Sequence, residues 1–377
     1  MNRLTFHLLG LAHIKTTKEN SACAYTQKII KLADMIKSRG HKIYFYGVEG
    51  SSVNCDEFIS VVDEDVLRKT YGDYDKSRNF FKHSPTDASY KTFNENAIRE
   101  INERKSERDI LLCTLGNYQK PIADAVNLMT VEPGIGYTGV FCGNKVFESY
   151  AWMHYVYGLM HIENGQWYDA VIPNYFDVSD YPFNDKKEDY LLYFGRIIGR
   201  KGVALASEIA KATGNRLYIV GQGSLDNDEE GLHLGSEKHI VYKPAVGPRE
   251  RAEIMGKAKA VIMPTYYIEP FGGVNVEAQL MGTPVITTDW GAFPETVLHG
   301  VTGYRCRTFE EFCWAVKNIY RIKSENCREW AEKNYSMERV AGMYEEYFQR
   351  INRLFASGWY EENPDRRELS WLEKYYV

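Results

Sequence analysis

The sequence has 377 residues, of which 44% are hydrophobic, 26% charged and 14% aromatic; this composition excludes a disordered chain and fits two globular domains of average size. Its 46 Lys and Arg residues against 51 Asp and Glu residues give a net charge of −5, which gives the chain no overall electrostatic attraction to nucleic acids or anionic membranes. No stretch approaches the roughly 18 apolar residues that span a bilayer, and the N-terminal apolar run is too short for a signal peptide, so we expect a cytoplasmic protein.

In the first half of the chain, short apolar runs alternate with amphipathic stretches, a pattern typical of a parallel sheet covered by helices on both faces. We expect strands over residues 4–9, 42–48, 110–115 and 170–173, and helices over 21–39, 92–105 and 146–160. The loops at the carboxyl ends of these strands should line one side of the sheet.

A second series of strands follows the polar, acidic stretch 177–189 and is expected at 190–194, 217–220, 240–242, 260–263 and 285–288. We therefore expect one doubly wound, Rossmann-like α/β domain over 1–180 and a second over 181–345, facing each other across a cleft. After residue 309 the pattern is mostly helical, and we expect a helical tail, 346–377, to pack back on the N-terminal domain. Clefts of this kind favour nucleotide ligands.

The stretch 263–303 contains two carboxylates, Glu269 and Glu277, on either side of the sequence Phe271-Gly272-Gly273-Val274. The glycines predict a tight turn that opens a helix over about 274–281, whose first turn offers unpaired N–H groups and a partial positive charge. Such a turn is an anion site. The two carboxylates suit the hydroxyls of a sugar and of a ribose.

A basic, glycine-containing loop follows the strand expected at 190–194. Gly195, Arg196 and Lys201 lie just past the strand end, where the two cations can project toward a ligand. A bidentate guanidinium and an ammonium together suit a diphosphate.

These two stretches resemble the family 4 glycosyltransferases, which are retaining nucleotide-sugar enzymes with the GT-B fold. The matching features are the E-x7-E motif from Glu269 to Glu277, the Arg196 and Lys201 pair, and, in order, the segments VIPN (171–174), GTPVI, GAFPE and GVTG. The resemblance covers residues 180–305 well and the remainder loosely.

The resemblance implies a role for each matching residue. Arg196 and Lys201 would hold the donor diphosphate, Glu269 would bind the transferred sugar, and Glu277 would bind the ribose. The backbone from Phe271 to Val274, including Gly272 and Gly273, would contact sugar and phosphate, and the loop from Tyr242 to Val246 would lie against the nucleobase.

The N-terminal half departs from the family pattern. Only Gly10 matches the glycine-rich loop that commonly follows the first strand. Many relatives place a histidine near the reacting sugar carbon, in a loop that corresponds to residues 130–137 here. Glu132 is the polar residue at that place, and we consider it either an active-site group or a structural one.

We expect no cofactor and no metal. The seven scattered cysteines contain no CxxC pair and predict reduced thiols. The Asp-x-Asp triplets at 63–65 and 73–75 fit a polar surface better than a metal site, because the Arg196 and Lys201 cations can balance the phosphate charge.

The expected activity is the transfer of a sugar from a nucleoside-diphosphate sugar to an acceptor hydroxyl on a glycan, a lipid, a protein or a modified nucleobase. One alternative is a nicotinamide-dependent oxidoreductase, because Gly221 and Gly223 follow a strand, although the third glycine of that fingerprint is missing. The other is a catalytically silent protein that binds sugar nucleotides on the same fold.

Overall fold

The computed structural model describes residues 2–20, 23–72, 83–165 and 168–355. The chain forms two compact units, one made of Met1–Tyr175 with Met337–Val377 and the other of Phe176–Ser336. The sequence-based boundaries, 180/181 and 345/346, lie five and nine residues beyond these. The second unit is therefore an insertion in the first.

Within the described residues, the first unit contains a parallel seven-stranded sheet in the order β3-β2-β1-β4-β5-β6-β7. Consecutive strands are wound outward from β1 in both directions, the doubly wound arrangement expected from the sequence. The strands are β1 (Thr5–Leu9), β2 (Lys42–Val48), β3 (Glu57–Val62), β4 (Ile110–Leu112), β5 (Met129–Ile135), β6 (Asn144–Phe147) and β7 (Ala170–Val171).

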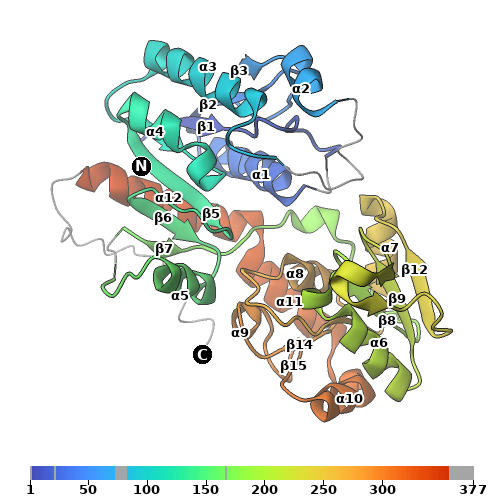
Figure 1. Ribbon diagram of the computed structural model, residues 1–377. Helices are drawn as coiled ribbons and strands as arrows, with labels where there is room; N and C mark the ends of the chain where they lie inside the picture. The colour runs from blue at the N-terminus through green and yellow to red at the C-terminus, as the bar shows by residue number, and fades with distance from the viewer. Residues whose placement is uncertain (1, 21–22, 73–82, 166–167, 356–377) are drawn as a thin grey trace. The chain divides into compact units, whose positions relative to one another are not determined.

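Helices from both ends of the chain cover this sheet: α1 (Ala24–Ser38), α2 (Glu64–Tyr71), α3 (Ala88–Arg104), α4 (Lys120–Val126), α5 (Tyr150–Leu159) and α12 (Met337–Leu354). Figure 1 shows α12, in red, among the blue and green elements of the first unit. Phe348 packs edge-on against Phe6 of β1 at 4.8 Å between ring centroids, and Glu345 pairs with His41 at 2.5 Å. The expected tail, 346–377, thus begins inside a helix of the first unit, and residues from 356 onward lie outside the described residues.

The second unit repeats the same winding in a six-stranded parallel sheet, again within the described residues, in the order β12-β9-β8-β13-β14-β15. Its strands are β8 (Tyr190–Phe194), β9 (Arg216–Val220), β12 (Ile240–Lys243), β13 (Ala260–Met263), β14 (Val285–Thr288) and β15 (Gly303–Cys306), with a small hairpin of β10 (Asp226–Asn227) and β11 (Leu232–His233). Its helices are α6 (Val203–Ala212), α7 (Pro248–Lys257), α8 (Gly273–Leu280), α9 (Phe293–Thr296), α10 (Phe309–Asn318) and α11 (Ser324–Tyr335). The α/β prediction is confirmed in both units.

Two expectations for the first unit are wrong. The expected helix 146–160 begins with strand β6 and becomes helical only after Ser149, whose side chain caps α5 by accepting from the Trp152 N–H. The expected loop 130–137 is mostly strand β5, which continues through Pro133 and Gly134 because the register with β6 shifts there. A bulge of this kind accommodates both residues inside a sheet.

None of the helices in the described ranges combines the length and the apolar character that a membrane span requires.

Candidate functional site

The sequence-predicted site residues of the second unit gather where its strand order reverses. Strands β8 and β13 are neighbours in the sheet, and the chain winds outward from them in opposite directions. The loops that follow these two strands therefore meet at the topological switch point, where ligands of such sheets bind. Arg196 and Lys201 follow β8, and Glu269 follows β13.

Glycines fix the path of the loop after β8. The backbone carbonyl of Arg196, in this loop, accepts a hydrogen bond from the Tyr193 hydroxyl at 2.7 Å. The loop ends at Gly202, whose φ is +75°. A Cβ at Gly202 would lie 1.9 Å from the Pro264 carbonyl oxygen, so only glycine lets this loop approach the one after β13. This approach places Lys201 beside the second loop.

Lys201 and Glu269 form an ion pair across the two loops, with Nζ 3.0 Å from Oε2. Their side chains are 14% and 12% exposed. The Tyr267 hydroxyl donates to the same Glu269 oxygen at 2.6 Å. Burial, together with the neighbouring Glu269 carboxylate, raises the pKa of Tyr267, so this phenol remains a hydrogen-bond donor. Two of the residues predicted for the site are thus in direct contact.

The turn from Phe271 to Val274 leads directly into α8. Phe271 is buried, with its ring packed near those of Phe176 and Tyr335. Gly272 has a left-handed backbone with φ +79°, and a Cβ there would lie 2.8 Å from the Phe293 ring. Gly273 and Val274 form the first turn of α8, whose N–H groups have no acceptor within the helix. The predicted turn and the helix that follows it are therefore present, and anion binding by this turn stays a prediction.

Glu277 lies one turn inside α8 and is 8% exposed. Its Oε2 forms an ion pair with the guanidinium of Arg251, on α7, and its Oε1 lies 3.5 Å from the Tyr181 hydroxyl. Arg251 also stacks over the Phe194 ring, with Cζ 4.9 Å from the centroid. Burial lowers the pKa of Arg251. Sequence reasoning missed Arg251.

The loop expected to contact a nucleobase connects β12 to α7. Tyr242 is 41% exposed, and its hydroxyl donates to the Gly223 carbonyl at 3.0 Å. Val246 is partly exposed two residues before α7 begins at Pro248. Because Arg251 lies in the first turns of the same helix, this loop and Glu277 are linked through α7.

Gly221 and Gly223, on which the nicotinamide alternative depends, allow the loop after β9 to pack closely against the loop after β8. A Cβ at Gly221 would lie 1.8 Å from the Gly195 carbonyl oxygen, and one at Gly223 would lie 2.9 Å from Ile197. Beyond them the chain enters the β10–β11 hairpin rather than a helix. A dinucleotide fingerprint requires a helix at that place, so the structure disfavours the oxidoreductase.

In the first unit, Gly10 meets a packing requirement. A Cβ there would lie 2.9 Å from both the Phe45 ring and the Tyr46 carbonyl oxygen, close contacts that glycine avoids. The Gly10 carbonyl accepts a hydrogen bond from Gln119 Nε2 at 2.8 Å. This glycine ties the loop after β1 to the one after β4.

Glu132 lies on β5 with its side chain buried. Its carboxylate accepts hydrogen bonds from the backbone N–H groups of Phe141 and Cys142, at 2.9 and 2.8 Å, and from the Tyr137 hydroxyl at 3.1 Å. Burial raises the pKa of Glu132. Of the two roles considered for Glu132, this environment favours the structural one, an anchor for the loop after β5.

Among the described residues, no group of three or more His, Cys, Asp or Glu side chains is placed to hold a metal ion. Asp63 caps α2 by accepting from the Val66 N–H at 2.7 Å, which gives the first Asp-x-Asp triplet a structural role. The second triplet, 73–75, lies outside the described residues.

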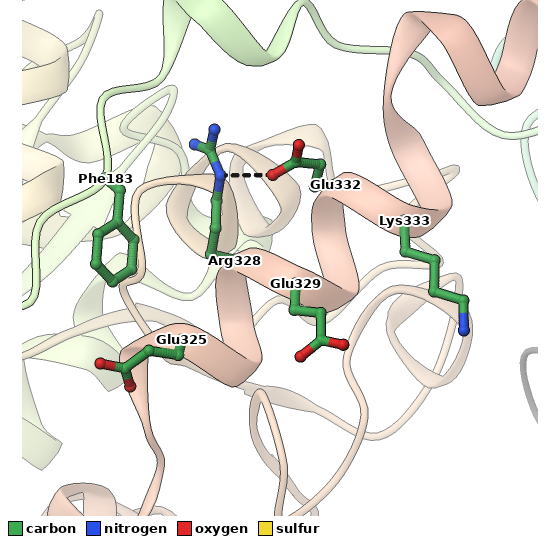
Figure 2. Close-up of a pocket in the computed structure, with 6 residues that line it drawn as sticks. All are labelled: Phe183, Glu325, Arg328, Glu329, Glu332 and Lys333. Carbon is green, nitrogen blue, oxygen red and sulfur yellow. Dashed lines mark hydrogen bonds and ion pairs between the residues drawn. The ribbon is translucent and has the colours of Figure 1, made fainter.

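A surface pocket on α11 lies away from this site. It is lined by Phe183, Glu325, Arg328, Glu329, Glu332 and Lys333, and Figure 2 shows Arg328 paired with Glu332, one turn further along the same helix. Arg328 also donates to the Leu280 carbonyl at 2.6 Å, which caps the carboxyl end of α8 with a cation. The pocket is therefore at the opposite end of α8 from the Gly272 turn.

The second unit is similar to known proteins. Residues 179–337 match the family described as "Glycosyl transferases group 1". Glycogen synthase from Mycobacterium tuberculosis is 33% identical in an alignment of 151 positions that covers 36% of this chain and 36% of its own. The chain therefore spans about a third of the length of that relative in this comparison.

Solved structures resemble the whole chain. AviGT4, a glycosyltransferase involved in avilamycin A biosynthesis, has a TM-score of 0.68 at 17% identity, covering 93% of this chain and 98% of its own. HepE from Anabaena in complex with UDP-glucose has a TM-score of 0.62 at 14% identity, covering 94% of this chain and 100% of its own. At these identities the likeness concerns the fold. Residues 179–337 are therefore similar to the group 1 glycosyl transferases, in agreement with the resemblance to family 4, and the chain has the GT-B fold.

Proposed function

We propose that this chain is a retaining, metal-independent glycosyltransferase that moves a sugar from a nucleoside diphosphate to an acceptor hydroxyl. The observation that carries the proposal is the Lys201–Glu269 ion pair at the switch point of a group 1 domain. It joins a cation suited to phosphate and a carboxylate suited to sugar hydroxyls beside the Gly272 turn.

The proposed chemistry is mainly electrostatic. As the bond between the sugar and the diphosphate breaks, negative charge grows on the departing phosphate oxygens. Arg196, Lys201 and the first-turn N–H groups of α8 would stabilise that charge more strongly in the transition state than in the bound donor. Glu269 would orient the sugar by binding the sugar hydroxyls. In a retaining reaction, the new bond to the acceptor oxygen would form on the same face of the sugar from which the diphosphate departs.

The comparisons support a nucleotide-sugar donor. HepE is solved in complex with UDP-glucose, and a second HepE structure holds UDP and glucose. We extend from them only the donor class and use uridine nucleotides as the first probes. The acceptor is a hydroxyl compound, in keeping with the reaction class.

The test has two stages. Thermal-shift and calorimetric titrations with UDP, GDP and ADP identify the bound base, because a ligand at 100 times its dissociation constant stabilises the folded chain by about 2.7 kcal/mol. The matching sugar nucleotides are then incubated with glycan, lipid and protein acceptors, and the product's anomeric configuration is read by NMR. Binding without transfer would favour the catalytically silent alternative. The absence of any nucleotide binding would contradict the proposal.

A further inference from the structure

Arg251 forms an ion pair with Glu277, and its contacts go beyond those of an ordinary surface ion pair. Its side chain is 26% exposed and its partner's 11%. The guanidinium pairs with the Glu277 carboxylate and also lies over the Phe194 ring. Planar stacking and a directional fork are properties of arginine that lysine lacks.

The pairing limits where the Glu277 carboxylate can go. Glu277 is anchored on α8 and Arg251 on α7, so the pair connects two helices, and Tyr181 lies 3.5 Å from the second carboxylate oxygen. A carboxylate held from two sides loses little further side-chain entropy when it accepts ligand hydrogen bonds. The geometry is that of a preorganised acceptor.

Arg251 also retains an unused donor. Its Nε is buried and has no hydrogen-bond acceptor among the residues that the structure describes. A buried donor without an acceptor is unfavourable, and the loop before α7 is the one that we expect to lie against the nucleobase. A ligand oxygen between this loop and Glu277 would satisfy the donor.

We propose that Arg251 is a positioning residue that fixes the Glu277 carboxylate for the ribose hydroxyls of a nucleoside diphosphate, and that this pair sets the preference for ribonucleotides over deoxyribonucleotides. The inference rests on the proposed function, because it takes Glu277 as the ribose partner. A carboxylate that is held in place should distinguish a ligand with the 2′-hydroxyl from one without it more strongly than a mobile carboxylate does.

The experiment compares UDP with 2′-deoxy-UDP by calorimetry, or the corresponding pair if GDP or ADP is the ligand bound. The wild type should prefer the ribonucleotide by about tenfold to a hundredfold, the range for a hydrogen bond to a charged group. Arg251→Met, which retains an apolar stem over Phe194, should bind the ribonucleotide at least tenfold more weakly and reduce the preference to about twofold. Arg251→Lys should restore part of the preference.

Two further variants separate positioning from a general structural effect. Glu277→Gln should lose the preference as Arg251→Met does, and the double variant should lose no more than either single one, because both remove the same interaction. Lys257→Met, on the same helix, breaks the exposed pair with Glu253 and should leave both affinities unchanged. Melting temperatures verify that each variant is folded.

The outcomes are distinguishable. A wild type that binds no nucleoside diphosphate overturns the proposed function. A wild type that binds, with Arg251→Met weakening both nucleotides equally and keeping the preference, overturns the positioning role alone. If Arg251→Met does not fold, the Arg251→Lys and Glu277→Gln variants decide, and an undiminished preference in Glu277→Gln contradicts the inference.

Discussion

The ion pair between Lys201 and Glu269 predicts opposite responses to bare nucleotide and to complete donor. The Lys201 ammonium pairs with Glu269 at 3.0 Å, so a diphosphate must share that cation with a carboxylate. Replacing Glu269 by Gln removes the competing negative charge and leaves Lys201 available. UDP should therefore bind Glu269→Gln at least as tightly as it binds the wild type.

The magnitude follows from the geometry. Two unit charges 3.0 Å apart attract by about 5 kcal/mol at an effective dielectric constant of 20. The cost of removing both charged groups from water offsets most of this attraction, because water solvates the ammonium once it is freed. The net contribution of the ion pair is then about 1 kcal/mol. The tightening of UDP should accordingly be up to about fivefold.

Turnover should respond differently. Glu269→Gln loses a partner of the sugar and should turn over slowly, whereas Lys201→Met removes one cation from the leaving group. The latter should lower kcat by a factor of about 100 to 1,000, which corresponds to about 2.7–4 kcal/mol, and should also weaken UDP. Lys211→Met, which breaks the exposed pair with Glu237, is the control.

Calorimetry with UDP and steady-state kinetics with the sugar nucleotide measure both effects. If Glu269→Gln weakens UDP as much as Lys201→Met does, the carboxylate contacts the nucleotide or only holds the lysine, and the assignment of Glu269 to the sugar is refuted.

Three other predictions concern the metal, the backbone and pH. Turnover should persist in EDTA, and its loss with recovery on adding Mn²⁺ or Mg²⁺ would refute metal independence. Gly202→Ala should lower the free energy of unfolding by at least about 1–3 kcal/mol, seen as a lower melting temperature, because the new Cβ would meet the Pro264 carbonyl. Gly214→Ala is the control, since Gly214 also has a positive φ, +69°, but no atom lies near the position of its Cβ, and it should be less destabilising. Equal losses in the two variants would contradict the role of the Pro264 contact. Burial lowers the pKa of Lys187 from 10.5 to about 8, so above pH 8 the unfolded chain binds more protons than the folded chain. The free energy of unfolding, measured with denaturant, should therefore increase by about 1 kcal/mol from pH 7 to pH 9. Lys187→Met should lack this increase.

The sequence predicts the second unit well because its central strands are buried on both faces. Such strands read as continuous apolar runs, and β8, β13 and β14 have the expected bounds. The turn at Gly272 is equally visible, since two adjacent glycines directly before a helical pattern strongly favour a tight turn. Glu269 and Lys201 could be placed near each other because parallel strands end at one edge.

Arg251 and Glu132 show what local patterns cannot predict. Arg251 lies in the charged stretch 248–257, which reads as a solvated helix face, and only the packing of α7 on the sheet buries it beside Glu277. Glu132 precedes Pro133 and Gly134, residues typical of loops, and the bulge that keeps β5 in the sheet depends on pairing with β6. Both depend on contacts between distant segments.

The interrupted first unit has a consequence for the order of folding. During synthesis, the residues of the second unit, Phe176–Ser336, emerge as one uninterrupted segment with all the strands of their sheet. The first unit begins earlier but lacks α12, which supplies the partners of Phe6 and His41, until the residues that follow the second unit have left the ribosome. Since domains fold as units once their contacts are available, we expect the second unit to finish first, and a nascent chain stopped before Met337 to leave the apolar surface of β1 and α1 open to chaperones.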